Sequence, residues 1–255
     1  MYLIDTHVHL YEKEYAPDLD AVLERAVTNG VRKMIMPNVD SGSIASMQEI
    51  ALQNAGSCFS MIGLHPCYVK EDVKLQLEKV KQELEVGNYV GVGEIGLDLY
   101  WDKTYLSEQM EAFLCQVRWA IEHQLPIAIH SRDATRNAID ALKPYVSHSL
   151  RGVFHCFGGT LEEAKEILEM GFYLGIGGVV TFKNGGLDKL LPHIPLDCLV
   201  LETDGPYLAP VPFRGKRNES GYLNLIARKV AEIYQVPFEK VAQKTSANAE
   251  KLFSI

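Results

Sequence analysis

Long apolar runs are missing from this sequence. No stretch reaches the roughly 18–20 consecutive apolar residues that span a bilayer, and the uncharged run 171–182 is short and dotted with glycines. The N-terminus reads MYLIDTHVHL, with an acid at Asp5 and without the basic and apolar regions of a secretory signal. Linkers and low-complexity tracts are missing as well. We therefore expect a soluble, cytoplasmic protein with one domain over residues 1–255.

Paired cysteines and an excess of positive charge are also missing. The five cysteines form an odd set without a Cys-x-x-Cys pair, which argues against a disulfide framework or a zinc ribbon. With 25 Lys and Arg against 33 Asp and Glu, the net charge is −8. This balance argues against a broad basic surface that grips nucleic acid through many phosphates, and it leaves room for one local site.

What the sequence does have is a regular alternation of short apolar segments with longer amphipathic ones. Thr160 and Glu163 form a predicted capping box, and Gly171 ends the helix that follows it. The charged run 70–85 carries apolar residues at helical spacing, which predicts a helix with one solvated face. Eight apolar segments are predicted strands: 3–4, 34–36, 59–63, 89–93, 127–129, 152–154, 172–176 and 198–201.

The near-continuous apolar character of these segments is typical of parallel strands buried on both faces. Eight such strands, separated on average by about 28 residues that include a helix, predict a single (β/α)8 TIM barrel. A doubly wound open sheet is the alternative fold.

Seven ionisable side chains stand at or just past the carboxyl ends of six of the predicted strands. In a closed barrel these ends converge on one mouth, where the loops build the active site. His7 and His9 point to the same side of an extended segment, because side chains alternate with period 2, so the two can share one ion. The full set is His7, His9, His65, Glu94, His130, His155 and Asp204.

A cluster of unpaired ionisable groups in one pocket destabilises a fold unless a charged partner holds it together, and divalent metal is the economical partner. One catalytic ion usually binds fewer than six side chains, because it keeps a coordination position open for water. We therefore expect two ions bridged by a carboxylate. Glu94 lies between the histidine sets in strand order and is the predicted bridge. The donor mixture suits Zn, Mn or Mg. The predicted ligands are His7, His9, Glu94, His130, His155 and Asp204.

Seven motifs along the chain resemble those of a known family. They are DTHVHL at 5–10, GLHP at 63–66, GEIGLD at 93–98, IHSRD at 129–133, HCFGG at 155–159, ETDGPYL at 202–208 and RGKRNE at 214–219. Together they resemble the TatD family of metal-dependent deoxyribonucleases in the amidohydrolase superfamily, from residue 4 to the final NAEKLF. The resemblance implies a (β/α)8 barrel with two divalent ions that hydrolyses phosphodiesters, commonly as an exonuclease on DNA.

Carried over by position, the resemblance also implies the role of each site residue. Asp204 would bind metal and handle the proton of the attacking water, and His65 would lie beside the ions and face the substrate. Asp204, Glu94 and His65 are therefore the predicted catalytic residues. One ion would be held by His7 and His9, the other by His130 and His155, with Glu94 between them.

Basic and aromatic residues near the motifs are predicted to contact the substrate together with His65. Arg132 and Arg214 can bind phosphate oxygens with two N–H groups each, and Tyr207 can stack on a base. The alternatives are a solvated loop charge for each arginine and a plug of the barrel mouth for Tyr207. We expect ends or single strands of DNA as substrate, because the body of a duplex does not enter a barrel mouth, and we expect no membrane or obligate protein partner.

Four further residues carry expectations of their own. Gly205 and Ser220 stand where the family usually has alanine and proline, so we expect a freer backbone, a looser loop and an effect on substrate preference. Cys156 is expected to face away from His155 and pack in the core, because side chains alternate along a strand. Arg217 is interpreted as a solvated loop charge.

Three other functions fit parts of the pattern. A phosphotriesterase, lactonase or deacetylase of the amidohydrolase type uses the same barrel and metal pair. Several of those enzymes bridge the metals with a modified lysine, whereas this chain has Glu94 there and no lysine nearby until Lys103. A phosphomonoesterase of another barrel family also begins with His-x-His. A non-catalytic binding barrel would be expected to have lost ligands, and none is missing from the sequence.

Overall fold

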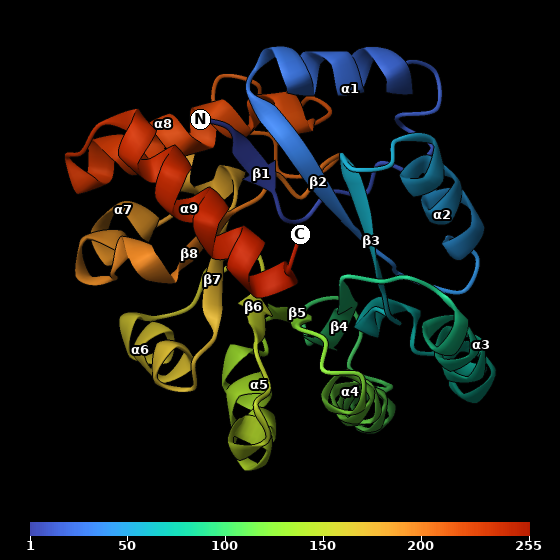
Figure 1. The fold of residues 1–255 in the computed structure, drawn as a ribbon. Helices are drawn as coiled ribbons and strands as arrows, with labels where there is room; N and C mark the ends of the chain where they lie inside the picture. The colour runs from blue at the N-terminus through green and yellow to red at the C-terminus, as the bar shows by residue number, and fades with distance from the viewer.

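Eight parallel strands form a ring in which each strand pairs with its neighbours in chain order (Figure 1). The structure is a computed structural model that describes the backbone of residues 1–255 and all side chains except those of residues 147 and 148. The ring confirms the predicted (β/α)8 barrel. The strands are β1 (Leu3–Asp5), β2 (Val31–Pro37), β3 (Cys58–Ile62), β4 (Gly91–Asp98), β5 (Ile127–Arg132), β6 (Gly152–Phe154), β7 (Tyr173–Ile176) and β8 (Leu199–Leu201).

Helices connect the strands and cover the outside of the ring. The predicted capping box is present: Thr160 Oγ1 accepts the N–H of Glu163 at 3.2 Å, and the Glu163 carboxylate accepts the N–H of Thr160 at 2.8 Å. The charged run forms α3, which buries Val80 and Leu84 and keeps its charged face in solvent. The helices are α1 (Leu19–Thr28), α2 (Ile44–Gln53), α3 (Val73–Val86), α4 (Leu106–Glu122), α5 (Thr135–Leu142), α6 (Leu161–Glu169), α7 (Leu187–Leu190), α8 (Leu223–Tyr234) and α9 (Phe238–Phe253).

Backbone hydrogen bonds join the ends of β1 and β8. The N–H of Thr6 donates to the carbonyl of Leu201 at 3.0 Å, and the N–H of Asp204 donates to the carbonyl of His7 at 2.9 Å. Residues at the two ends of the chain are therefore neighbours at the carboxyl edge of the barrel. This closure brings His7 and Asp204 to the same point.

The opposite end of the barrel is filled by apolar side chains and by α9. This helix crosses the centre of the ring in Figure 1, and its last turns pack against residues that point into the barrel from the strands. The interior is therefore a packed core at this end, and only the carboxyl edge is left for a site. The cluster consists of Ile4, Ile35, Met61, Ala128, Val153, Val200, Ala249, Leu252 and Phe253.

β4 is longer than predicted, and this changes the place of Glu94. The strand runs to Asp98, so the expectation that Glu94 ends it is wrong. The pairing of β4 with β5 shifts register between Val92 and Ile95, and such an irregularity re-aims the side chains beside it. Glu94 reaches the mouth from within the strand, and Asp98 takes the terminal position. His130 likewise lies within β5 rather than at its end.

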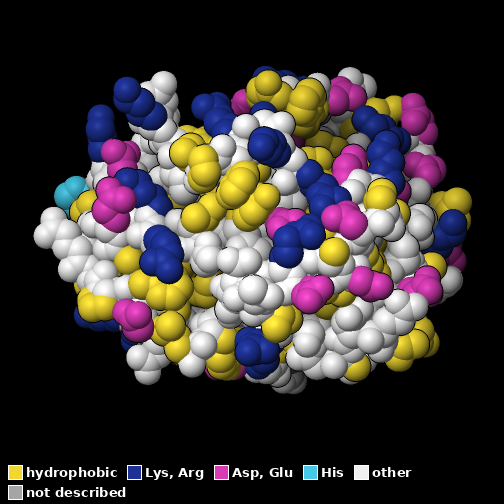
Figure 2. Space-filling view, turned by 90° about the horizontal axis from the view of Figure 1, so that it is seen from above, with side chains coloured by type: hydrophobic (Ala, Val, Ile, Leu, Met, Phe, Trp, Pro, Cys, Tyr) yellow, Lys and Arg dark blue, Asp and Glu magenta, His cyan; other side chains and the backbone are white. Residues whose placement is uncertain are grey.

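Charges of both signs cover the outside. On the face that Figure 2 shows, Lys and Arg side chains are interspersed with Asp and Glu, so a polyanion meets carboxylates there as well as cations. Among the helices of the described chain, none has both the length and the apolar character to cross a membrane.

Candidate metal centre

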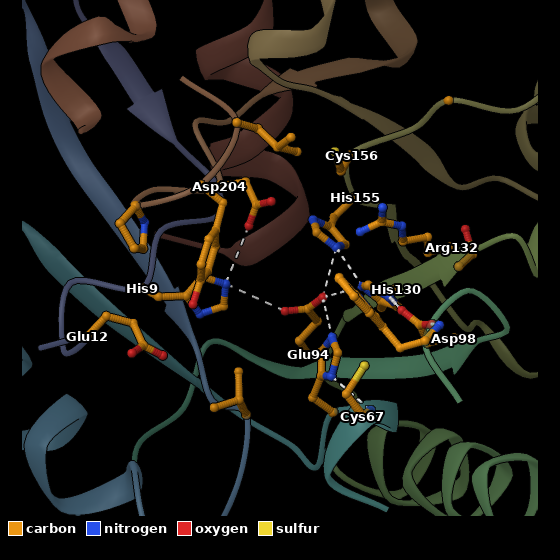
Figure 3. A pocket seen from close by; sticks show the side chains of 18 of the residues that line it. His9, Glu12, Cys67, Glu94, Asp98, His130, Arg132, His155, Cys156 and Asp204 are labelled. Atoms are coloured by element: carbon orange, nitrogen blue, oxygen red, sulfur yellow. Dashed lines mark hydrogen bonds and ion pairs between the residues drawn. The ribbon is translucent and has the colours of Figure 1, made fainter. Parts of the chain in front are cut away.

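The two carboxylate oxygens of Glu94 face two different groups of histidines (Figure 3). Glu94 is buried, and the histidines reach it from β5 and from the segments after β1, β3 and β6. Glu94 Oε2 lies 3.1 Å from His7 Nε2 and 3.6 Å from His9 Nε2. Glu94 Oε1 lies 3.2 Å from His65 Nε2, 2.8 Å from His130 Nδ1 and 2.8 Å from His155 Nε2. The five histidines singled out in the sequence therefore meet around one carboxylate.

Asp204 completes the group on the side of His7 and His9. Its Oδ1 lies 3.5 Å from His9 Nε2 and 3.9 Å from His7 Nε2. The Asp204 side chain is 13% exposed, against 3% for Glu94. Of the two carboxylates, Asp204 is therefore the one that water reaches from the cavity.

The charges of this cluster act strongly on one another. Burial raises the pKa of Glu94, but interactions with the surrounding histidines, His155 first, lower this pKa well below its usual range overall. Burial also acts upward on the pKa of Asp204, and the interaction with His9 outweighs it together with the other histidines. Both carboxyl groups are therefore ionised, which is the form that attracts a cation.

A hydroxyl group behind His9 decides which ring nitrogen carries the proton. His9 Nδ1 lies 2.8 Å from the hydroxyl oxygen of Tyr11, and this hydroxyl donates its own proton to the carbonyl of Pro37 at 2.6 Å. His9 Nδ1 must therefore be the donor. His9 Nε2 then keeps a free lone pair, which points toward Glu94 and Asp204.

Buried carboxylates also stand behind the rings of His130 and His155, and the one behind His130 makes a hydrogen bond. His130 Nε2 lies 2.8 Å from Asp98 Oδ2, so we assign the proton to Nε2 and the free lone pair to Nδ1, beside Glu94. His155 Nδ1 lies 3.5 Å from Glu202 Oε1, and His155 Nε2 faces Glu94. Carboxylates behind histidine rings fix the tautomer and raise the basicity of the ring in metal sites.

His65 has the opposite arrangement. Its Nδ1 accepts the backbone N–H of Cys67 at 3.1 Å, so the proton of the neutral ring is on Nε2, which faces Glu94. A protonated Nε2 donates a hydrogen bond and offers no lone pair to a metal. His65 is therefore a hydrogen-bond donor at the edge of the cluster.

The donor atoms lie close enough together to hold divalent ions. In each of three groups, one nitrogen or oxygen atom per residue lies within 4.8 Å of the others. Imidazole nitrogen and carboxylate oxygen are ligands that catalytic divalent metals take in proteins. The residues present therefore fit a divalent-metal centre. Two of the groups contain predicted ligands alone: His7 with His155 and Asp204, and His7 with His9 and Glu94. The third, His65 with Glu94 and His130, includes His65, whose Nε2 carries the ring proton.

The cluster lies at the floor of a cavity of about 930 Å³. Its volume is in the range of roughly 300–1,000 Å³ that small-molecule sites occupy. The guanidinium carbon of Arg214 lies 4.6 Å from the ring centroid of Phe182, and the ring of Tyr207 lies 6.1 Å from that of His9. Cationic and aromatic groups therefore stand above the cluster. All four residues predicted to contact the substrate line the cavity: His65, Arg132, Tyr207 and Arg214.

Three residues that stand behind the histidine rings were not predicted from the sequence: Tyr11, Asp98 and Glu202. Each lies two or four positions from a predicted ligand, namely His9, Glu94 and Asp204 in turn. Asp98 lies on the same strand as Glu94, so the period-2 alternation of side chains is the signal that could have found it. Tyr11 lies in a turn and Glu202 lies past the end of β8, where this alternation does not apply.

Cys156 lines the cavity, so the expectation that it packs in the core is wrong. β6 ends at Phe154, and the alternation of side chains along the strand therefore does not extend to Cys156. The φ angle of Cys156 is +45°, which turns the chain at this point, and its N–H donates to Glu202.

The basic residues after β8 divide into two kinds. Lys216 lines the cavity together with Arg214. Arg217 is not among the lining residues. Its Nη1 lies 2.6 Å from Oδ1 of Asp18, the residue just before α1. The same Nη1 donates to the carbonyl of Glu14 at 2.7 Å. Arg217 is thus not the solvated loop charge that the sequence predicted: it is paired within the fold and fastens the loop to the start of α1.

Ser220 ties its loop to the barrel instead of loosening it. Ser220 is buried, and its hydroxyl donates to Asp5 Oδ2 at 2.7 Å. Asp5 is also buried and accepts the N–H of Thr203 at 2.9 Å through Oδ1. Burial raises the pKa of Asp5 to about 7, although these hydrogen bonds act in the opposite direction. Ser220 is therefore one of the groups that stabilise a buried carboxyl beneath the cluster.

The whole chain is similar to one family of proteins. The family model described as TatD related DNase matches residues 4–254. The chain is 39% identical over 254 residues to the metal-dependent hydrolase YabD of Bacillus subtilis, with 99% of each chain covered. It is 33% identical over 259 residues to the 3'-5' ssDNA/RNA exonuclease TatD of Yersinia pseudotuberculosis, with 99% of this chain and 100% of that protein covered.

A solved structure agrees with this. The TatD homologue YJJV of Escherichia coli superposes with a TM-score of 0.93 at 29% identity, covering 99% of this chain and 98% of that one. The fold, the clustered metal-binding side chains and the matching family model agree. The chain therefore belongs to the TatD family of metal-dependent hydrolases, enzymes that act on ester bonds.

Proposed function

We propose that this hydrolase cleaves phosphodiester bonds of DNA from a free end, with two divalent ions held at Glu94. The observation that carries the proposal is the division of the Glu94 carboxylate between two histidine groups. A carboxylate that presents each oxygen to a separate donor set has the arrangement of a bridging ligand. We assign His7, His9 and Asp204 to one ion and His130 and His155 to the other.

The name of the Yersinia relative supports the substrate class. That protein is named as an exonuclease on single-stranded DNA and RNA. Single strands are therefore the first substrate to test, and RNA is tested beside DNA. Zn, Mn and Mg all suit a mixed set of imidazole and carboxylate donors.

The residues of the chain take separate parts in the reaction. Bound divalent ions supply such a site with a lowered pKa for water and with positive charge against phosphate oxygens. Asp204, the carboxylate that water reaches, accepts the proton of the attacking water. His65 donates a hydrogen bond from Nε2 to a phosphate oxygen, because its Nδ1 is occupied by the N–H of Cys67.

Few cationic side chains line the cavity to bind the phosphates that flank the scissile bond. Arg132, Arg214 and Lys216 line the cavity and bind flanking phosphates, while Tyr207, with half of its side chain exposed, stacks on a base. For single strands, the logarithm of the binding constant falls with the logarithm of the salt concentration at a slope of roughly −0.7 per phosphate contact. We therefore expect a shallow slope that corresponds to about two to four contacts.

The depth of the site favours ends over duplex interiors. The cluster lies at the floor of a cavity in the barrel mouth, which a single strand or a frayed end enters and the body of a duplex does not. We therefore expect the enzyme to act as an exonuclease on single-stranded or frayed DNA.

The test compares end-labelled single-stranded DNA, RNA, blunt duplexes and closed circles, each with Mg²⁺, Mn²⁺ or Zn²⁺ and over a range of salt. We expect stepwise loss of nucleotides from single strands, slower loss from blunt duplexes and none from closed circles. Elemental analysis of the active protein should give about two ions per chain, as a bridged pair requires. Rapid cutting of closed circular duplex, or preferential hydrolysis of lactones or phosphotriesters in parallel assays, would contradict the proposal.

A further inference from the structure

An aromatic pair and an arginine form a compact group beside the cavity, and two of its members, Trp101 and Arg132, line the cavity. Tyr100 and Trp101 follow β4, and Arg132 is the last residue of β5. The guanidinium carbon of Arg132 lies 3.8 Å from the ring centroid of Tyr100 and 5.4 Å from that of Trp101. The two aromatic rings are 4.9 Å apart and perpendicular. We call these three residues the aromatic wall.

The two aromatic side chains of the aromatic wall are exposed to solvent. Trp101 is 69% exposed and Tyr100 is 52% exposed, so more than half of each side chain meets solvent. A single exposed aromatic residue is common on protein surfaces, but two of them with a guanidinium stacked on one ring make a ready-made aromatic surface. Among the described side chains, Arg132 makes no ion pair with a carboxylate, unlike Arg25, Arg136 and Arg217. Its charge is therefore available to a ligand.

One carboxylate connects the aromatic wall to the metal centre. Asp98 Oδ1 accepts the backbone N–H groups of Tyr100 and Trp101, each at 3.0 Å. Asp98 Oδ2 lies 2.8 Å from Nε2 of His130. Asp98 is buried, so the loop that carries Trp101 is held at a fixed place relative to the histidines.

The aromatic wall and the metal centre share one cavity. Trp101 and Arg132 line it together with His130 and Glu94. A ligand that reaches Glu94 with a phosphodiester therefore passes the indole of Trp101. A flat face and a free cation on one wall match two parts of a nucleotide, the base and the phosphate. A guanidinium over the face of a ring keeps its N–H groups at its own edge, where they can donate to phosphate oxygens.

We propose that the aromatic wall is a binding subsite for one nucleotide of the strand, in which a base stacks on Trp101 and Arg132 binds the adjacent phosphate. The inference rests on the proposed nuclease function and adds a residue that selects strands carrying bases. Stacking of a base on an aromatic side chain is tolerant of sequence, since every base has a π face. The subsite therefore favours bases over abasic positions without reading a particular sequence.

The first experiment measures binding through fluorescence. The chain has two tryptophans, and Trp119 is buried in α4, so Trp119→Phe leaves Trp101 as the single reporter. With Mg²⁺, a phosphorothioate oligodeoxynucleotide is expected to quench Trp101, because it resists hydrolysis and carries bases. An abasic strand of the same length should quench it much less. Equal quenching by both strands, or none by either, would overturn the subsite.

The second experiment measures kinetics and needs no change at Trp119. Trp101→Ala should raise KM for single-stranded DNA by about 5- to 150-fold, the equivalent of about 1–3 kcal/mol of stacking, and leave KM for an abasic strand nearly unchanged. Trp101→Phe should restore part of the loss. Leu52→Ala is the control, since Leu52 is 80% exposed on α2 and is not among the cavity-lining residues.

The two proposals fail in different ways. If normal strands are hydrolysed, and Trp101→Ala changes KM equally for strands with and without bases, the subsite is wrong and the nuclease function stands. If no strand is hydrolysed with any divalent ion, yet strands with bases quench Trp101 selectively, the nuclease function is wrong and the subsite stands.

Discussion

The hydroxyl of Tyr15 fills the space into which a side chain at Gly205 would project. A Cβ on Gly205 would collide with this hydroxyl oxygen and come within 3.3 Å of Cγ2 of Val8. Tyr15 is fully buried, and its hydroxyl donates to the carbonyl of Asn218 at 2.6 Å. Gly205 therefore provides room for a tyrosine rather than freedom of the backbone, directly beside Asp204.

Replacement of Gly205 should reveal this contact. Gly205→Ala is expected to lower the free energy of unfolding by about 1–3 kcal/mol, because a buried site has no space for the added methyl group. Tyr15→Phe removes the opposing oxygen and leaves the carbonyl of Asn218 without its donor, at a cost of about 1–3 kcal/mol. The double variant should be less destabilised than the sum of the single changes. Denaturant unfolding of all four proteins measures the difference, and strict additivity would refute the contact.

Ser220→Ala should destabilise the protein although it removes a single oxygen atom. The change leaves one of the acceptor positions of buried Asp5 without its donor, and we expect a loss of about 1–3 kcal/mol in the free energy of unfolding. Ser46→Ala is the matched control, because the hydroxyl of Ser46 makes an exposed bond to the carbonyl of Ser43. The control should change stability by less than about 0.5 kcal/mol. Equal effects of both changes in denaturant unfolding would show that the Asp5 bond contributes nothing.

Asp98→Asn should weaken metal binding by reversing the tautomer of His130. An amide N–H in place of Asp98 Oδ2 donates to Nε2 of His130 and moves the ring proton to Nδ1, the nitrogen beside Glu94. We expect a loss of about 10- to 100-fold in affinity, as for other partners of metal-bound histidines. Calorimetric titration with Zn²⁺ or Mn²⁺ measures this. Asp133→Asn is the control, since exposed Asp133 lines the same cavity and has no bond to a histidine. An affinity equal to that of the control would argue against the tautomer assignment.

Asp204→Asn should separate turnover from metal content. The amide still offers an oxygen but accepts no proton, so at least one ion should stay bound while kcat falls by roughly 10²–10⁴. Elemental analysis and steady-state kinetics on the same preparation provide both values. A rate near that of the wild type would exclude Asp204 as the proton acceptor.

Acid should remove the stabilising effect of Asp18. Asp18 Oδ1 lies 2.6 Å from Nη1 of Arg217 and Asp18 Oδ2 lies 3.2 Å from Nη2 of Arg25. The hydrogen bond with Arg217 is the main cause that lowers the pKa of this carboxyl from 3.8 to about 2. The folded state therefore binds the proton less readily than the unfolded state, so the contribution is complete above about pH 4 and is lost as the pH falls toward 2. The difference in unfolding free energy between wild type and Asp18→Asn should shrink over this range. A difference that stays constant from pH 7 to pH 2 would contradict the ion pair.

Much of the barrel was predictable because its signals are local. Each strand is a short apolar segment, and each helix between them has its own periodicity and end signals, as at Thr160 and Gly171. The histidines and acids of the centre stand near the carboxyl ends of these segments, and the topology of a barrel gathers such ends in one place. The positions of the donors could therefore be predicted without any long-range contact.

The remaining features depend on contacts between distant segments. β4 contains Gly91, Gly93 and Gly96, and glycine disfavours strands, so its length did not follow from its composition. A Cβ on Gly96 would collide with the carbonyl of His130, which shows that the glycine allows β5 to approach closely. The fit of Tyr15 against Gly205 likewise joins residues 190 positions apart, and no local pattern reports it.

Among the described residues, α9 and the apolar cluster close one end of the barrel, so the cavity opens at the carboxyl edge of the strands. A strand that enters has no exit beneath the histidines, since Leu252 and Phe253 close that end. Under the proposed function, the released nucleotide leaves through the same opening by which the DNA strand enters, beside Trp101 and Tyr207. Under the proposed function, each cut therefore requires the remaining strand to draw back before the next nucleotide can take its place. With that function, we therefore expect release through this opening, rather than the reaction at Glu94, to limit how many nucleotides are removed in one binding event.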